Sequence, residues 1–243
     1  MRSGNPVLRE STFTERSNSS LSMTLTGVVS RSMYLLLLVA AAGAVAWTQS
    51  ASHPALSYPL ILAGAIGGFI SAMVTSFKKE WAAITAPLYA ILEGLFVGGI
   101  SFVMERRFPG LVLQAVLLTF CVAFALLAAY QSRIIRPSET FKAVIFGATA
   151  AIALAYVFSF VIGIFFHTSL PFIHDSGPIG VTFGLIVTVV AALNLVLDFD
   201  LIENGITSRA PKWMEWYSAF ALTVTLVWLY IEILRLLSKL RRD

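Results

Sequence analysis

The sequence predicts an all-α fold, a polytopic membrane bundle of seven transmembrane helices. Of the 243 residues, 58% are apolar and only 12% are charged, and the mean hydropathy is +0.83. An ordinary soluble domain carries about 25% charged residues, so this chain has too little charge to cover a water-soluble surface. Its apolar residues also gather in seven runs, each long enough to cross the ~30 Å hydrocarbon core as a helix. The composition therefore excludes a soluble domain and a disordered chain.

The seven expected spans are separated by short polar segments, and they cover residues 32–48, 58–76, 81–104, 111–130, 141–166, 179–202 and 214–237. Residues 1–30 are rich in Ser, Thr, Asn and Arg, and we expect a disordered polar tail there. Residues 31–243 then form the transmembrane domain. The start of this domain also resembles a signal peptide, with Ala-Val-Ala at 44–46. A signal does not usually follow so long a polar tail, so we interpret the segment as the first helix.

Positive charge predicts the orientation. The net charge of +4 does not indicate a nucleic-acid partner, because the basic residues form short clusters between apolar runs. Eleven of the 17 Lys and Arg residues lie on the side of the N terminus, which predicts a cytoplasmic N terminus. The C-terminal cluster disagrees, because seven spans would place Arg235, Lys239, Arg241 and Arg242 outside. Either the other charges outweigh this cluster, or one span is re-entrant and both ends are cytoplasmic.

Two glycine patterns predict close helix packing. Gly64 and Gly68 lie in the second expected span, and Gly94 and Gly98 lie in the third. Small residues at this spacing let two helix backbones approach each other closely in lipid. We assign structure, and no chemistry, to these glycines.

Carboxylates inside the apolar runs are the candidate functional groups. Glu93 lies in the third span, Asp198 and Asp200 lie late in the sixth, and Glu232 lies late in the seventh. An ionisable residue in a membrane is costly and is a functional candidate by default. No Lys or Arg lies in the middle of a span to neutralise these acids. They are therefore expected to keep a proton or to hold a cation.

Glu93 is expected near the bilayer midplane, because it follows Trp81 by 12 residues, or roughly 18 Å of helix. It either lines an ion or proton path or, when protonated, fixes the packing of a neighbouring helix. In the sixth span Asp198 shares a helix face with Asn194, four residues earlier, and is the preferred functional candidate. Asp200 is rotated by about 200° from Asp198. It groups with the polar residues Glu203 and Asn204, and we expect solvated residues at a helix end.

The two acids of the seventh span have structural alternatives. Glu232 precedes Arg235 by three residues, so an ion pair within the helix would satisfy it. Glu215 opens the span, where the helix dipole favours a carboxylate.

The sequence lacks the motifs of catalytic sites that we searched for. It contains no His-Glu-x-x-His zinc motif, no Gly-x-Ser-x-Gly elbow and no phosphate-binding glycine-rich loop, so we expect neither an enzyme nor a cofactor. The lone Cys121 excludes an intrachain disulfide. The histidines lie in expected loops. His167, His174 and Asp175 share one loop and could bind a metal weakly, but solvated loop residues are the preferred interpretation.

Three segments resemble the transmembrane Bax inhibitor motif family, and its bacterial branch in particular. They are LDFDLI at 197–202, LYIEILRLL at 229–237 and MRSGNPVL at the N terminus. The resemblance implies six helices around a central seventh and a pH-sensitive calcium leak through a bacterial inner membrane. It also implies that two acids on the sixth and seventh helices share a proton. By motif these are Asp198 and Glu232, the latter replacing the aspartate of the family, and they would also be the ligands of a transported Ca²⁺.

Simple geometry gives a different pairing. A hairpin that turns near Ser208 would bring Tyr217 level with Asp198 and would place Glu232 toward the opposite membrane surface. Glu215 is then the alternative partner of Asp198, and Glu93 could link Asp198 to Glu232.

Three functions are consistent with these observations. The preferred one is cation flux, with Ca²⁺ as the transported ion and protonation of intramembrane carboxylates as the gate. The second is a non-conducting regulator of a membrane-bound protease or another membrane complex, with residues 1–30 as the contact segment. The third is a proton-coupled carrier, which no substrate-specific polar cluster supports. The lipid bilayer is the one certain partner, and the sequence does not predict an oligomeric state.

Overall fold

The computed structural model describes residues 22–166 and 177–241, and within them seven helices are long and apolar enough to cross a membrane. These helices are α1 (Leu25–Ser52), α2 (Ser57–Phe77), α3 (Ala82–Arg107), α4 (Leu111–Gln131), α5 (Glu139–Phe166), α7 (Pro178–Thr207) and α8 (Met214–Leu240). Short 3-10 helices, Pro54–Leu56 and Lys79–Trp81, precede α2 and α3. The expected polytopic helical bundle is confirmed.

A polar cap sets the start of α1. Thr24 has an extended backbone, and its hydroxyl accepts a hydrogen bond from the Gly27 amide at 3.1 Å. Such a cap satisfies one of the amides that a helix start leaves without a partner. Residues 25–30, expected in the tail, are therefore helical. With 28 residues α1 is about 42 Å long, more than the hydrocarbon core requires. The earlier part of the tail lies outside the described residues.

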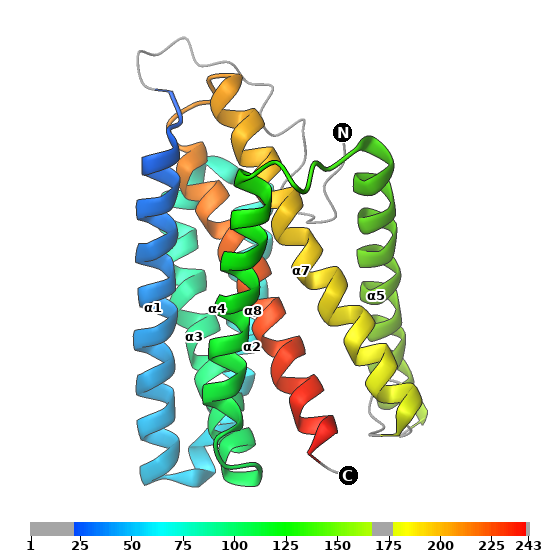
Figure 1. Cartoon of the computed structure of the whole chain (residues 1–243). Coiled ribbons are helices and arrows are strands. Elements are labelled where there is room, and N and C mark those ends of the chain that lie inside the picture. Colours follow the sequence, from blue (N-terminus) through cyan, green and yellow to red (C-terminus); the bar gives the residue numbers. More distant parts are fainter. Residues whose placement is uncertain (1–21, 167–176, 242–243) are drawn as a thin grey trace.

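The last helix, α8, is the centre of the bundle. It packs against α1, α3, α4 and α7, and buried residues occur in every turn from Met214 to Lys239. Figure 1 shows α8 passing behind α4, between α3 and α7. A helix in this position meets protein on most sides, so its polar residues face other helices and not lipid. The expected central seventh helix is confirmed.

Glycines bring α3 close to both α1 and α2. A Cβ on Gly98 would lie 2.7 Å from the Cα of Gly43 on α1. A Cβ on Gly64 of α2 would lie 2.5 Å from the amide nitrogen of Phe96 on α3. Real Cβ atoms do not approach other atoms so closely, so these backbone contacts require glycine. The two glycine patterns thus have the packing role that the sequence predicted.

The start of α1 and the end of α8 lie at opposite ends of the bundle (Figure 1). The seven long helices each extend over most of the length of the bundle, and none turns back as a re-entrant segment would. At the α1 end, an antiparallel bridge joins Ser22 to Pro211, and the Met23 amide donates to the carbonyl of Ala210 at 2.8 Å. The chain before α1 is therefore attached to the turn between α7 and α8. Helix α5 lies at the edge of the bundle beside α7.

Candidate functional site

A polar stripe follows one face of α8. Ser218, Thr225, Glu232 and Lys239 are spaced seven residues apart, and all four are buried. Seven residues are close to two helical turns, so the stripe drifts by only ~20° at each step. Thr225 and Lys239 contact α7, and Glu232 contacts α5. The stripe therefore faces the junction of α5, α7 and α8.

Asp198 on α7 meets this stripe at Thr225. The Thr225 hydroxyl donates a hydrogen bond to Asp198 Oδ2 at 2.6 Å, and both residues are buried. The Asp198 side chain is fully inaccessible to solvent. A carboxylate in this position is costly, and a hydrogen bond from a neighbouring helix partly offsets that cost.

Asn194 lies one turn from Asp198 on α7, and it is also buried. Its amide nitrogen donates to Thr149 Oγ1 on α5 at 2.9 Å and to the Val190 carbonyl at 2.9 Å. Its amide oxygen, Oδ1, has no hydrogen-bond partner among the described residues, and neither does the Ser218 hydroxyl on α8. Buried oxygens without protein partners are sites where water or a cation binds.

The Glu232 carboxylate interacts with side chains of two helices, α5 and its own helix α8. The Tyr156 hydroxyl on α5 donates to Glu232 Oε1 at 3.0 Å. Arg235 Nη1 lies 3.3 Å from Glu232 Oε1 and donates to the Tyr156 oxygen at 2.5 Å. The ion pair that the sequence offered as the structural alternative therefore exists. Tyr156 links it to α5.

Helix α5 contributes a matching stripe, again at a spacing of seven residues. Its members are Lys142, Thr149 and Tyr156, and they contact Asp200, Asn194 and Glu232 respectively. Lys142 is buried, and its amine lies 2.7 Å from Asp200 Oδ2. We call the polar residues of this junction the polar column: Lys142, Thr149, Tyr156, Asn194, Asp198, Ser218, Thr225, Glu232 and Lys239.

Asp198 and Glu232 belong to the same column but do not contact each other. Asp198 is level with Thr225, and Glu232 lies seven residues farther, roughly 10 Å along α8. The simple hairpin estimate, which put Tyr217 level with Asp198, is also wrong. The non-helical connection runs from Ser208 to Trp213, so the turn is centred near Pro211 and each level shifts by several residues. A proton shared directly by the two acids does not fit this geometry.

Glu215 does not pair with Asp198 either. It is fully buried where the chain enters α1, and it accepts hydrogen bonds from the amide (2.9 Å) and hydroxyl (2.8 Å) of Thr24. Arg31 forms an ion pair with it, and Lys212 lies 2.8 Å away. Two cations and two hydrogen-bond donors therefore balance this carboxylate, and its role is to attach α1 to α8.

Glu93 lies at the contact between α2 and α3. A Cβ on Gly68 of α2 would lie 2.9 Å from Glu93 Oε2, so the carboxylate occupies the space that this glycine leaves open. The structure therefore does not bring Glu93 to Asp198 or Glu232. Its position agrees with the packing alternative, although a proton path along α2 and α3 is not tested by this geometry.

The remaining acids of α7 lie at the end of the helix. Glu203 accepts hydrogen bonds from Tyr130 of α4 and from Arg133, just after the end of that helix, the latter at 2.6 Å. This hydrogen bond raises the pKa of the Arg133 guanidinium, which stays charged. Asp200 accepts from Asn204 at 3.2 Å in addition to its ion pair with Lys142. Both acids are paired with α4 or α5 and are not simply solvated.

The described residues contain no group of three or more His, Cys, Asp or Glu side chains that could hold a metal ion. His167, His174 and Asp175, the weak metal candidates, lie outside the described residues.

Sequence reasoning missed the neutral members of the column. Thr149, Tyr156 and Thr225 were not selected, because hydroxyl residues are common in membrane helices and cost little there. The sequence does contain a pattern that indicates them, because polar residues repeat with a period of seven in both helices. They are residues 142, 149 and 156 in α5 and residues 218, 225, 232 and 239 in α8. A buried polar stripe at this period indicates one helix face turned toward protein.

These features define a polytopic helical membrane protein with carboxylates buried along a central helix. The sequence model of the Bax inhibitor 1 like family matches residues 5–242, and the chain belongs to that family. No curated protein and no solved structure matches the chain in the corresponding comparisons.

Proposed function

We propose that this protein passes cations across a bacterial inner membrane through the polar column, with Ca²⁺ as the ion and protonation of buried carboxylates as the gate. The observation that carries the proposal is the fully buried Asp198, which lies beside the central helix. One turn away is Asn194, whose Oδ1 has no hydrogen-bond partner in the part of the chain that the structure describes. Calcium prefers oxygen ligands, and the Asp198 carboxylate, the Asn194 amide oxygen and the Thr225 hydroxyl are groups of this kind. Family membership supports the same function.

The gate follows from competition at one carboxylate. A proton and a calcium ion both bind the charged form of Asp198, so a higher proton concentration displaces the metal. Glu232 supplies a second carboxylate farther along the column, and a cation would pass from one to the other. Arg235 and Tyr156 hold Glu232 in place, so movement of α5 would change access to that second step.

Calcium flux into proteoliposomes that contain the purified chain tests the proposal. We expect flux that depends on pH, and Asp198→Asn and Glu232→Gln should each alter that dependence. Glu203→Gln is the matched control, because Glu203 is an acid of α7 outside the column, and it should behave as the wild type does. Unaltered pH-dependent flux in both column variants would overturn the gate. Absence of cation flux at every pH would overturn the whole proposal.

The orientation belongs to the same proposal. The end of the bundle with the start of α1 carries more Lys and Arg residues, which favours a cytoplasmic N terminus. The C terminus then lies on the outer side, because α8 ends at the opposite end of the bundle. Protease protection of tags placed at the two termini, in closed vesicles, would test this assignment.

A second candidate function is regulation of a membrane-bound protease or another membrane complex. The observation that favours it is the attachment of Ser22, Met23 and Thr24 to the α7–α8 turn and to Glu215. A partner that binds the preceding residues would thereby act on the central helix. Deletion of residues 1–21 should abolish partner binding and leave flux intact. Loss of flux with unchanged partner binding would contradict this role.

A further inference from the structure

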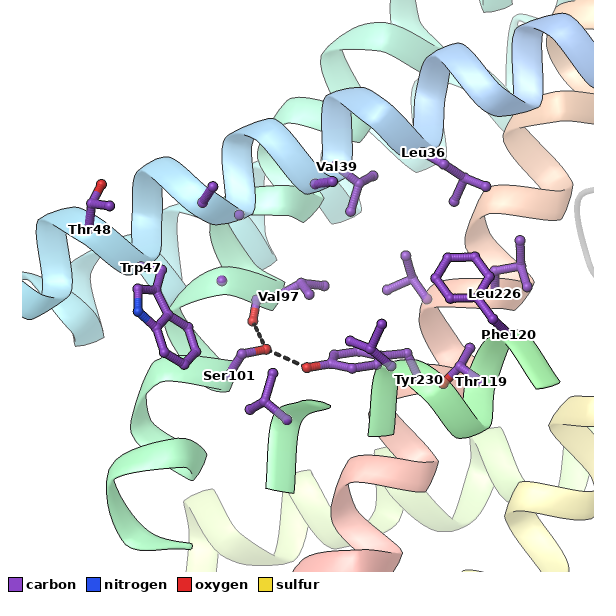
Figure 2. A pocket seen from close by; sticks show the side chains of 17 residues that line it. Leu36, Val39, Trp47, Thr48, Val97, Ser101, Thr119, Phe120, Leu226 and Tyr230 are labelled. Carbon is purple, nitrogen blue, oxygen red and sulfur yellow. Dashed lines mark hydrogen bonds between the residues drawn. The ribbon is translucent and has the colours of Figure 1, made fainter. Parts of the chain in front are cut away.

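A separate cavity lies on the opposite side of α8 from the polar column. Its volume is about 510 Å³, and it is bordered by α1, α3, α4 and α8. Figure 2 shows Leu36, Val39 and Trp47 on one side and Phe120, Leu226 and Tyr230 on the other. This volume falls within the ordinary range of ligand-binding pockets, about 300–1,000 Å³.

The hydroxyl groups that border the cavity all have hydrogen-bond partners among the described residues, including Thr48, whose hydroxyl donates to the Val45 carbonyl at 2.9 Å. The Ser101 hydroxyl lies 2.6 Å from the Tyr230 hydroxyl and 2.6 Å from the carbonyl oxygen of Val97 (Figure 2). Thr119 donates to the carbonyl of Ala115 on its own helix at 2.7 Å. An ordered water needs two to four polar partners, and these groups are already paired. The cavity therefore suits an apolar occupant.

The small residues of α1 explain why the cavity exists. Gly43 lies against the backbone of Gly98, which draws α1 toward α3. Ala40 and Ala44 border the cavity from α1 and are exposed, and their small side chains leave space there. All of the lining residues belong to helices long and apolar enough to cross a membrane, so the solvent around the cavity is lipid hydrocarbon.

Arg106 is separated by one aromatic ring, that of Phe102, from Trp47, which borders the cavity. The Trp47 ring packs edge-on against Phe102, with ring centres 5.8 Å apart. The guanidinium of Arg106 lies 5.8 Å from the centre of that same Phe102 ring. Arg106 is exposed in the last turn of α3, at the boundary of the span. Trp and Arg at a span end lie at headgroup depth, and a guanidinium binds phosphate oxygens well.

We propose that this cavity binds one acyl chain of an anionic phospholipid, whose phosphate group lies beside Arg106. The apolar lining takes the chain, and the positive charge at the span end selects the headgroup. The site is independent of the polar column, so its failure would leave the proposed cation flux unaffected.

A photoactivatable lipid tests the site in vesicles. The purified protein is reconstituted with a trace of phosphatidylglycerol that carries a diazirine in one acyl chain, illuminated, digested and analysed by peptide mass spectrometry. We expect label on the cavity-lining parts of α1 and α4. Ala40→Phe fills the cavity and should remove most of that label, whereas Ala41→Phe, on the exposed face outside the cavity, should keep it.

A second pair of variants approaches the cavity from α4 and covers the case in which Ala40→Phe does not fold. Val116→Phe should also remove the label, and the exposed Leu117→Phe should keep it. Equal label in the filled and control variants would overturn the proposal. Label spread evenly over the outward faces of α2 and α5 would do the same, as would an apolar small molecule retained in the cavity through purification.

The headgroup assignment is tested with matched lipids. Labelled phosphatidylglycerol should mark the cavity more strongly than phosphatidylcholine that carries the same chain. Arg106→Gln should remove this preference, and Arg107→Gln, the neighbouring exposed arginine, should keep it. Equal labelling of the wild type by both lipids would overturn the choice of an anionic lipid.

Discussion

The hydroxyl of Thr225 on α8 donates a 2.6 Å hydrogen bond to the carboxylate of Asp198 on α7, and neither residue is accessible to solvent. This contact fixes the level at which the two most buried helices meet. It also shows that a hydroxyl on the central helix, 27 residues later in the chain, is a partner of Asp198. Any protonation of Asp198 therefore changes a contact inside the bundle.

Thr225→Val should weaken the attachment of α7 to α8. The valine keeps the shape of threonine but cannot donate a hydrogen bond to Asp198. Interhelical hydrogen bonds in membrane proteins contribute about 0.6 kcal/mol on average and up to about 1.7 kcal/mol, so we expect a loss in that range. Unfolding in mixed micelles measures it. Thr225→Ser keeps the hydroxyl and should retain most of the stability, and an equal loss in both variants would contradict a role for the hydrogen bond.

Glu215→Gln should destabilise the protein strongly. The glutamine keeps the shape of the buried side chain but leaves the partly exposed Arg31 and Lys212 without their carboxylate. Removal of one partner from a fully buried ion pair costs about 3–5 kcal/mol, and we expect a loss toward the lower end of this range because solvent reaches both cations. Thermal unfolding of the detergent-solubilised protein measures the change.

Lys212→Gln is the control for that variant, because the Lys212 side chain is 40% exposed. An exposed ion pair contributes about 0–1 kcal/mol, so we expect a small effect. If Glu215→Gln were as mild as Lys212→Gln, the buried cluster would not be what attaches α1 to α8.

Gly98→Ala should separate α1 from α3. A Cβ at this position would lie 2.7 Å from the Cα of Gly43, and a backbone atom cannot move aside as a flexible side chain can. Overpacking of this kind costs about 1–3 kcal/mol. Gly147→Ala on α5 is the matched control, because a Cβ there meets nothing within 4 Å. We expect it to be neutral or stabilising by up to about 1 kcal/mol. Equal unfolding temperatures for the two variants would show that the glycine contact is not tight.

Tyr156→Phe and Glu232→Gln should be coupled. The Tyr156 hydroxyl donates to both oxygens of Glu232, at 3.0 and 3.2 Å. Tyr156→Phe removes this interaction, and Glu232→Gln removes its negative charge and one of its two acceptor oxygens. Contacting residues show interaction energies of about 0.5–3 kcal/mol in a double-mutant cycle. The cycle is measured by unfolding of the wild type, the two single variants and the double variant.

A second cycle is the control for this one. It combines Tyr156→Phe with Thr119→Val, which changes a hydroxyl of α4 that bonds only within its own helix turn. The effects of these two substitutions should add to within about 0.5 kcal/mol. Additivity in both cycles would mean that Tyr156 does not attach α5 to the central helix through Glu232.

The sequence predicted some parts of the site better than others. It identified Asp198, Asn194 and Glu232 because charge and amide groups inside an apolar run are costly and therefore visible. It did not identify Thr225 or Tyr156, whose hydroxyls carry no such cost and become informative only when a partner is known. The heptad spacing of the α5 and α8 stripes was present in the sequence, but a period alone does not say which face it meets.

The sequence did not predict which residues of α7 lie opposite the acids of the seventh span. A shift of the α7–α8 turn by three or four residues moves every cross-helix pair by about twice that number, and turn geometry here depends on the bridge from Ser22 to Pro211. That bridge joins residues far apart in the sequence. The sequence alone therefore could not decide which residue of α8, among Glu232, Glu215 and Tyr217, lies opposite Asp198.

Composition and hydrophobic run length by themselves determined that this protein is a membrane bundle of seven helices with acids inside it. These properties follow from the free-energy cost of placing polar groups in hydrocarbon. That cost depends on the sequence of each segment and not on its neighbours. Only the tertiary structure decided that Glu215 attaches α1, that Glu93 faces α2, and that Asp198 meets Thr225. Partner choice depends on the rotation and offset of whole helices, and these are set by glycine contacts and turns distributed along the entire chain.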